Sequence, residues 1–261
     1  MNKFKMKVTA VIGVILLIGI YYYVTLPAIN IHASEFWMYL VVLVILAAVV
    51  FIRKKNLNRY DWKESKGLKV ILGILAVLVI AYVAGTVLSS PIVNAKKYQE
   101  LLTVKNGEFT KDIEELSFDQ IPLLDKDSAE LLGDRKMGSM VDMVSQFEVD
   151  ELYSQINYQD QPVRVSPLKY ASVIKMVYEH ERRNPGYIKI DMATQNTELV
   201  KLEKGMKYTT SDHFNRNIYR HLRFKYPTYI FNDLSFEVDE EGTPYWVCPV
   251  KKYKYRYFSA V

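Results

Sequence analysis

Three long apolar runs occupy most of the first 90 residues. Val8 to Leu26 and Phe36 to Ile52 carry no charged side chain, and Leu68 to Leu88 carries only Lys69, in its first turn. Because a helix rises about 1.5 Å per residue, about 20 residues cross a hydrocarbon core of roughly 30 Å. Helices also satisfy their backbone amides internally, as lipid requires. The sequence therefore predicts three transmembrane helices within residues 1–90.

Basic residues flank these runs unevenly. Three lysines precede the first run, at positions 3, 5 and 7, whereas residues 27–35 between the first and second runs contain neither Lys nor Arg. The segment between the second and third runs carries six basic residues: Arg53, Lys54, Lys55, Arg59, Lys63 and Lys66. The positive-inside rule then predicts a cell-membrane protein with a cytoplasmic N-terminus and an extracytoplasmic C-terminal region.

The first run is expected to remain as an anchor, with a cleaved signal peptide as the alternative. It is long, and no small-x-small cleavage pattern precedes Ile29. Polar side chains inside the runs, such as Thr9, Thr25 and Thr86, are sparse, and no acid or histidine lies at mid-membrane depth. Ion and proton pathways usually contain such residues. The membrane part is therefore predicted to be an anchor or assembly surface and not a transporter.

The basic charge of the chain belongs to its membrane part. Residues 1–90 hold 10 basic and three acidic residues, whereas residues 91–261 hold 24 basic and 26 acidic residues. A region without a basic excess lacks the charge that phosphate binding needs, so we expect no nucleic-acid partner. Cys248 is the single cysteine, which excludes an internal disulfide and a thiolate zinc site. We expect no cofactor.

Residues 91–126 are predicted to be a linker, and residues 127–261 an extracytoplasmic α+β domain. Helices are expected over Ser128–Met137, over Tyr170–Arg183, and from the cap cluster Thr210-Ser211-Asp212 to about Arg223. Alternation and turn residues predict strands over Val141–Val149, Tyr153–Tyr158, Pro162–Leu168, Tyr187–Met192, Thr197–Leu202, Thr228–Val238 and Pro244–Val250. Recurring helix–strand–strand units indicate an antiparallel sheet with helices packed on one face.

Local chemistry refines these helices. Asp127 or Ser128 is expected to cap the first, and Asn184-Pro185-Gly186 to stop the second. In the third, Phe214, Ile218 and Leu222 at a spacing of four predict a buried stripe.

Two segments resemble known families. GYIKIDMATQNTELVKL (Gly186–Leu202) resembles the strand–turn–strand of PepSY-type domains, and EGTPYWVCPV (Glu241–Val250) is similar to the same element used again. The stretch from GDRKMGSMVDMVSQF through YRHLRFKYPTYIF to FEVDEEGTPYWV is similar to a family of uncharacterised multi-pass membrane proteins of Gram-positive bacteria. This chain looks like a short or truncated member. The resemblance implies a cell-envelope location and a PepSY-like fold, without implying a chemistry.

Candidate binding residues cluster on the third predicted helix. Arg216 and Arg220 are four residues apart and share a helical face, and Arg223 follows at the helix end. A cationic face suits teichoic acid, anionic lipid or an acidic partner. The alternative is a solvated amphipathic helix with acidic neighbours.

Two further sets of side chains have the residue types of a functional site. Cys248, His221 and Asp239 are residue types of a catalytic Cys–His–Asp set. However, a thiol in mid-strand is ordinarily structural, and no glycine-rich elbow accompanies it. The acids around the last hairpin suit calcium chemically but match no known loop spacing: Asp233, Glu237, Asp239, Glu240 and Glu241. We therefore expect no catalytic and no metal site.

The C-terminal run KYKYRY alternates tyrosine with basic residues, which predicts a two-faced edge strand. Such an edge invites strand addition by an envelope protein or by a second copy of the chain. The sequence favours a membrane-anchored cell-envelope protein that presents a non-catalytic interaction domain. The alternatives are an envelope enzyme or enzyme-associated subunit whose active site needs a partner, and a truncated fragment of a larger membrane protein.

Overall fold

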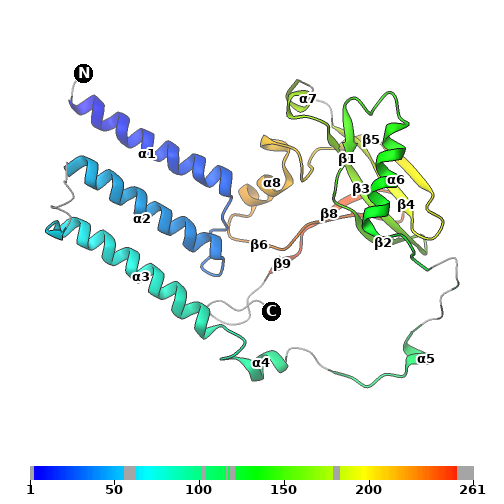
Figure 1. Ribbon diagram of the computed structural model, residues 1–261, viewed down its shortest axis with the longest axis horizontal. Coiled ribbons are helices and arrows are strands. Elements are labelled where there is room, and N and C mark those ends of the chain that lie inside the picture. The colour runs from blue at the N-terminus through cyan, green and yellow to red at the C-terminus, as the bar shows by residue number, and fades with distance from the viewer. Residues whose placement is uncertain are drawn as a thin grey trace. The chain divides into compact units, whose positions relative to one another are not determined.

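A computed structural model describes residues 3–55, 63–100, 104–113, 115, 117, 121–178 and 183–251 (Figure 1). The chain divides into two compact units. The first, here called the helical unit, comprises residues 1–104, 223–230 and 250–261; the second, the sheet unit, comprises residues 105–222 and 231–249.

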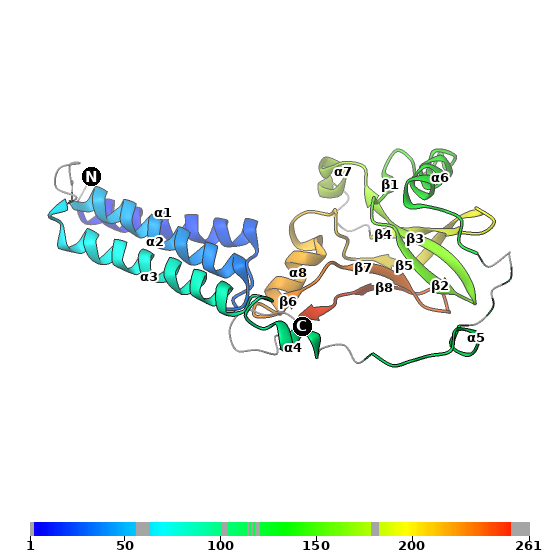
Figure 2. The same cartoon turned by 60° about the horizontal axis from the view of Figure 1, so that its bottom comes forward.

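The helical unit contains three long helices, drawn blue to cyan in Figure 2: α1 (Lys3–Thr25), α2 (Ser34–Lys55) and α3 (Lys66–Leu88). A short helix, α4 (Ala95–Gln99), follows α3. The predicted apolar runs fall on α1, α2 and α3. By length and composition, α2 and α3 are each able to cross a membrane, and the described apolar part of α1 is the shorter stretch Ile12–Thr25.

Aromatic side chains gather at one end of the helical unit. The Tyr21 and Tyr39 rings stack with centroids 5.6 Å apart, and Tyr22 meets Tyr39 edge-on at 5.9 Å. The Trp37 and Tyr82 rings lie 6.1 Å apart. This group, here called the aromatic collar, joins the end of α1, the start of α2 and the end of α3, which is the pattern of an interfacial aromatic belt.

A distant part of the chain is bonded to the loop between α1 and α2. The Ile29 amide donates to the Pro227 carbonyl at 2.7 Å, and the Asn30 side-chain amide donates to the Thr228 carbonyl at 2.8 Å. Residues 223–230 therefore lie at the same end of the helices as the loop that lacks Lys and Arg.

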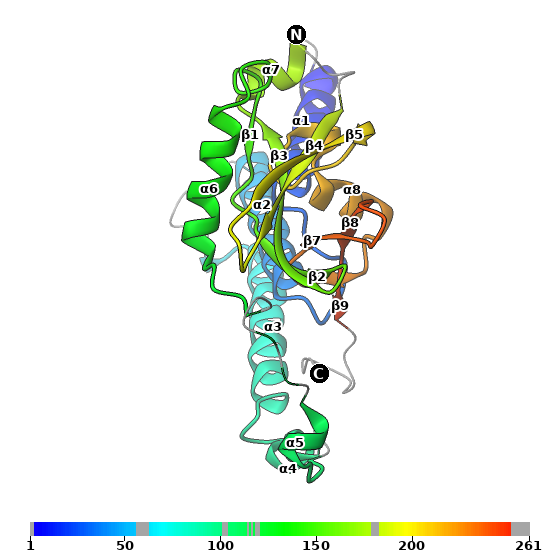
Figure 3. The ribbon, with the colours of Figure 1, turned by 90° about the vertical axis from the view of Figure 1, so that its right-hand side faces the viewer.

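The sheet unit contains a five-stranded antiparallel sheet, confirming the α+β class (Figure 3). Its strands are β1 (Phe147–Val149), β2 (Ser154–Tyr158), β3 (Gln161–Tyr170), β4 (Asn184–Asp191) and β5 (Thr197–Met206). The order is β1-β3-β4-β5, and β2 also pairs with β3. A separate hairpin joins β7 (Ser235–Val238) to β8 (Pro244–Val247), and β6 (Ile230–Phe231) pairs with β9 (Val250–Lys251).

The remaining helices are short except for one: α5 (Phe109–Asp112), α6 (Lys126–Gly138), α7 (Val173–Tyr178), the 3-10 turn η3 (Phe214–Arg216) and α8 (Ile218–Lys225). The predicted first helix is confirmed as α6, but its cap is Asp125 and not Asp127 or Ser128. The Asp125 carboxylate accepts from the Ser128 amide at 2.7 Å, which satisfies a first-turn donor.

Two cores cover the two faces of the sheet. One face carries Leu168, Ile188 and Ile190, which pack with residues of α6 such as Ala129 and Met137. The other face carries Val163, Val165 and Tyr187, which pack with Phe236 and Val238 of the β7–β8 hairpin. Adjacent residues of β4 enter different cores because strand side chains alternate between faces. The second core is therefore closed by a hairpin and not by a helix.

A tight hairpin joins β2 to β3 directly after Tyr158. Gln159 and Asp160 have φ of 50° and 60°, the left-handed pair of a two-residue turn whose twist matches that of its strands. The register pairs Tyr158 with Gln161. The turn residues thus set which side chains of β2 and β3 face the second core.

One predicted strand and one predicted helix differ in extent from the structure. Val141–Val149 was expected to be extended, but Met140 to Gln146 forms turns and only β1 is a strand. The second predicted helix is reduced to α7 among the described residues, because Tyr170 ends β3; residues 179–182 lie outside the described part. Asn184-Pro185-Gly186 does not stop a helix but begins β4, with a register shift between Asn184 and Gly186.

The third predicted helix is broken. Phe214 has φ of 53° and is 53% exposed, so it does not belong to a buried helical stripe. Helix α8 begins only at Ile218, with the Asn217 side chain accepting from the Arg220 amide at 3.0 Å. Asn217 is thus the cap, and Thr210-Ser211-Asp212 has a different role.

Candidate functional site

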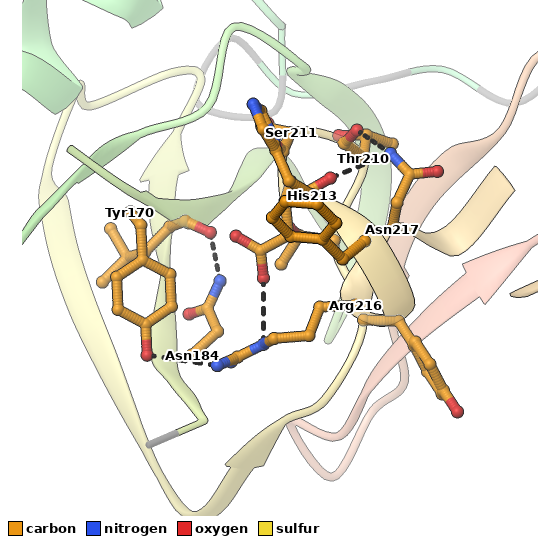
Figure 4. Close-up of polar contacts among 12 residues, drawn as sticks. Tyr170, Asn184, Thr210, Ser211, His213, Arg216 and Asn217 are labelled. Atoms are coloured by element: carbon orange, nitrogen blue, oxygen red, sulfur yellow. Dashed lines mark hydrogen bonds and ion pairs between the residues drawn. The ribbon is translucent and has the colours of Figure 1, made fainter. Parts of the chain in front are cut away.

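The loop from Thr209 to Asn217 closes on itself before α8. The Thr209 amide donates to the Arg216 carbonyl at 3.2 Å, and the Thr209 carbonyl accepts from the Ile218 amide at 2.9 Å. The Asn217 side-chain amide donates to the carbonyls of Thr210 and Asp212, at 2.9 and 3.0 Å. These contacts tie the two ends of the loop together (Figure 4).

Asp150, which follows β1, anchors this loop to the sheet. Its carboxylate accepts hydrogen bonds from the hydroxyls of Thr210, at 3.1 Å, and Ser211. Its backbone carbonyl accepts from Ser166 of β3 at 2.7 Å. The polar residues that sequence analysis assigned to a helix cap therefore bind a carboxylate about sixty residues earlier in the chain.

A buried ion pair lies beneath the loop. Arg216 Nε lies 3.4 Å from Asp212 Oδ2, and their side chains are 8% and 1% exposed. The Arg216 guanidinium lies 5.0 Å from the centroid of the Tyr170 ring, and Figure 4 shows it beside the Tyr170 hydroxyl, to which Nη1 donates. Burial raises the pKa of the Asp212 carboxyl, and the charge of Arg216 acts in the opposite direction. The pair links the loop to the end of β3.

A cleft of about 240 Å³ opens beside this pair. Its lining comes from the β1–β3 end of the sheet, the start of α7 and the loop: Glu148, Lys169, Tyr170, Ala171, Ser172, Val173, Ser211, Asp212 and His213. Lys169 Nζ lies 3.5 Å from Glu148 and 3.7 Å from Glu151, so both charge signs meet at the rim. The lining suits a small polar or charged group of a partner.

The serine hydroxyls of the cleft form hydrogen bonds with the local backbone and with Asp150. Ser172 Oγ accepts from the Lys175 amide at 3.3 Å, and Ser211 Oγ donates to Asp150. His213 Nδ1 faces the Ser211 carbonyl at 3.1 Å. Neither serine is bonded to the histidine in these contacts, and a nucleophile needs such a base.

The three arginines predicted to bind an anion have different surroundings. Arg216 lies in η3, so the helical face that it was expected to share with Arg220 does not form. Arg220 Nη1 donates to the Phe214 carbonyl at 2.9 Å. Arg223 Nε donates to the Leu26 carbonyl at 2.9 Å. Each of the three arginine side chains therefore has at least one contact within the protein.

The side chains of the Cys–His–Asp set also have separate contacts. The His221 ring stacks on Tyr208 with centroids 4.2 Å apart, and Cys248 Sγ lies 3.6 Å from the Trp246 carbonyl. Burial raises the pKa of the Cys248 thiol, which disfavours the reactive thiolate. The cleft beside Asp212 is lined by none of the three.

The acids weighed as calcium ligands stabilise turns. Asp239 Oδ1 accepts from the amides of Glu241, at 3.2 Å, and Thr243, at 2.7 Å, within the β7–β8 turn. Glu240 accepts from the Gln159 amide at 2.7 Å. Within the described ranges, no group of three or more His, Cys, Asp or Glu side chains is arranged to hold a metal ion.

Sequence reasoning missed the buried pair and its anchor. Sequence reasoning assigns Asp212 to a helix cap and Arg216 to a cationic helical face shared with Arg220, so it does not pair the two residues. Asp150 gave no local signal, because its partners are distant in the chain. No protein-family model, curated protein sequence or solved structure matches the chain.

Proposed function

We propose that the protein is a membrane-anchored component of the cell envelope that presents a non-catalytic α+β interaction domain outside the membrane. Helices α1, α2 and α3 form its anchor, and the N-terminus is cytoplasmic. The domain is PepSY-like, as in the family of Gram-positive bacterial membrane proteins that the sequence resembles. The proposal rests on the apolar helices, on the charge asymmetry of their flanks, and on one structural contact.

That contact is the bonding of Ile29 and Asn30 to Pro227 and Thr228. The loop between α1 and α2 is free of Lys and Arg, so the positive-inside rule assigns it to the outer side. A segment that bonds to this loop must be on the same side. The contact therefore supports an outer location for the chain around residues 223–230, by an argument that does not use the charge of the C-terminal region.

The interaction role is supported by the chemistry of the cleft. At the rim of the cleft, Lys169 forms ion pairs with Glu148 and with Glu151, which is 79% exposed. Glu148 is 52% exposed, so both carboxylates that pair with Lys169 are accessible to a charged partner. The partner is an envelope protein or a second copy of the chain.

Single-cysteine labelling tests the topology. We would place a cysteine at Lys63 or at Lys201 in a Cys248→Ala background and treat intact cells with a membrane-impermeant thiol reagent. Both positions are exposed in the structure, so access depends only on the side of the membrane. We expect labelling at 201 alone, and labelling of both after permeabilisation. Labelling at 63 without 201 in intact cells would contradict the proposal.

A further inference from the structure

The chain from Phe224 to Ile230 presents aromatic rings at the end of the helical unit that carries the aromatic collar. Phe224 is 55% exposed, Tyr226 36% and Tyr229 47%. The rings of the two tyrosines stack with centroids 5.2 Å apart. Exposed aromatic groups that gather in this way usually mark a surface that contacts another phase or molecule.

This segment is held firmly against the end of α1. Arg223 Nε donates to the Leu26 carbonyl at 2.9 Å, and Arg223 Nη1 donates to the Tyr229 carbonyl at 2.6 Å. The Phe224 ring lies 6.1 Å from that of Tyr22, edge-on. The segment therefore has a fixed position relative to the helices that are proposed to cross the membrane.

The neighbouring loop extends the same apolar surface. Ile29, whose amide bonds to Pro227, is 48% exposed, and Ile31 is also 48% exposed. A cation is available beside the rings, because Lys225 is exposed and its Nζ lies 5.5 Å from the Tyr226 ring centroid. Aromatic rings, isoleucines and a lysine together match the mixed chemistry of the headgroup region.

We infer that Phe224–Ile230 is an interfacial membrane element, with its rings in the headgroup region of the outer leaflet. This inference rests on the proposed function, because it needs α1–α3 to span the bilayer. Amphipathic rings partition to this depth, about 5–10 Å into the boundary between headgroups and acyl chains. Lys225 adds attraction to anionic lipid phosphate. The lipid is favoured over a second copy because the Phe224 ring packs on Tyr22 of the collar, and the proposed anchor would place the collar at the membrane interface.

Fluorescence quenching by nitroxide lipids tests the element in the full chain. A single cysteine at Tyr226, in a Cys248→Ala background, carries an environment-sensitive fluorophore in vesicles of phosphatidylcholine and phosphatidylglycerol. Matched probes at Val77, 66% exposed on α3, and at Lys201 on β5 serve as membrane and solvent controls. Nitroxides are placed either near the headgroup or deep in the acyl chain.

We expect the probe at 226 to lose fluorescence with headgroup nitroxides more than with deep ones, the probe at 77 to show the reverse, and the probe at 201 to be unaffected. A probe at 226 that behaves like the one at 201, while 77 is quenched, would overturn the interfacial element and leave the anchor in place. Protection of 226 from both lipid nitroxides and aqueous iodide would mean that protein covers it, which also overturns the inference. Absence of quenching at 77 would refute the anchor itself.

Discussion

Replacing Asp212 by Asn removes the carboxylate beside a guanidinium that the protein buries over the Tyr170 ring. Replacing Arg216 by Met does the converse and leaves the carboxylate in the same dry site. Both side chains are less than one-tenth exposed. Each single change therefore leaves one buried charge without its partner. The double variant Asp212→Asn/Arg216→Met removes both charges and keeps the volume of the two side chains similar.

The distance between the two charged groups sets the energy of their attraction. At 3.4 Å between Arg216 Nε and Asp212 Oδ2, and with an effective dielectric constant of about 20, two unit charges attract by about 5 kcal/mol. Dehydration of each ion costs several kcal/mol, and the raised pKa of the Asp212 carboxyl has burial as its largest cause. We expect each single variant to lower the free energy of unfolding by about 3–5 kcal/mol, and the double variant by about 1–2 kcal/mol or less.

Urea unfolding of the full chain in detergent micelles measures these values. Trp246 packs 5.4 Å from Phe236 in the second core and reports on the sheet unit once Trp37 and Trp62 are replaced by Phe. Lys201→Met, an exposed change, is the matched control. If the destabilisation of the double variant equals the sum of the two single values, the two charges do not interact, and the reasoning about a coupled buried pair fails.

Three further predictions concern the sheet and its hairpin. Burial raises the pKa of Tyr187 to about 12. The protonated phenol therefore stabilises the folded state at pH values below the pKa of the unfolded chain, and this contribution is lost as pH rises through the folded-state pKa. We expect the Tyr187→Phe variant to show a smaller fall in its urea midpoint between about pH 10 and 12 than the unchanged protein. Gly186→Ala would push a methyl group against the Val200 carbonyl oxygen, so we expect the free energy of unfolding to fall by about 1–3 kcal/mol in chemical denaturation. An unchanged free energy of unfolding would contradict the pairing of β4 with β5 at this position. Cys248→Ala should retain partner capture from membranes and cost about 1 kcal/mol; complete loss of capture in a folded variant would favour catalysis.

Local signals predicted the parts of the fold that depend on neighbouring residues. The turn at Gln159 and Asp160 has its left-handed residues where polar side chains interrupt two apolar runs. Strand β4, its turn and β5 follow the alternation from Tyr187 onward, and the apolar runs coincide with α1, α2 and α3. In each case the residues that determine the structure lie within a few positions of one another.

Long-range contacts explain the failures. Asn184 resembles a helix stop in sequence, but its side-chain Nδ2 donates to the Leu168 carbonyl and its side-chain Oδ1 accepts from the Gly186 amide at 3.2 Å. These two bonds fix the start of strand β4. Likewise Ser211 donates to Asp150 instead of capping a helix. The candidate cleft depends on these partners, so its position was not predictable from spacing alone.

The surroundings of the arginines change how binding experiments should be interpreted. Arg216 holds the loop beneath the cleft, and Arg223 holds Phe224–Ile230 to the end of α1. Loss of partner capture on replacing either residue therefore has a structural explanation that needs no direct contact with a partner. Lys169 at the cleft rim is a better residue for testing partner recognition. Its own side chain is 18% exposed, but the carboxylates with which it pairs, Glu148 and Glu151, are 52% and 79% exposed. Charge reversal there tests recognition while the buried pair stays in place, and loss of capture in a variant with unchanged urea unfolding would assign recognition to the cleft.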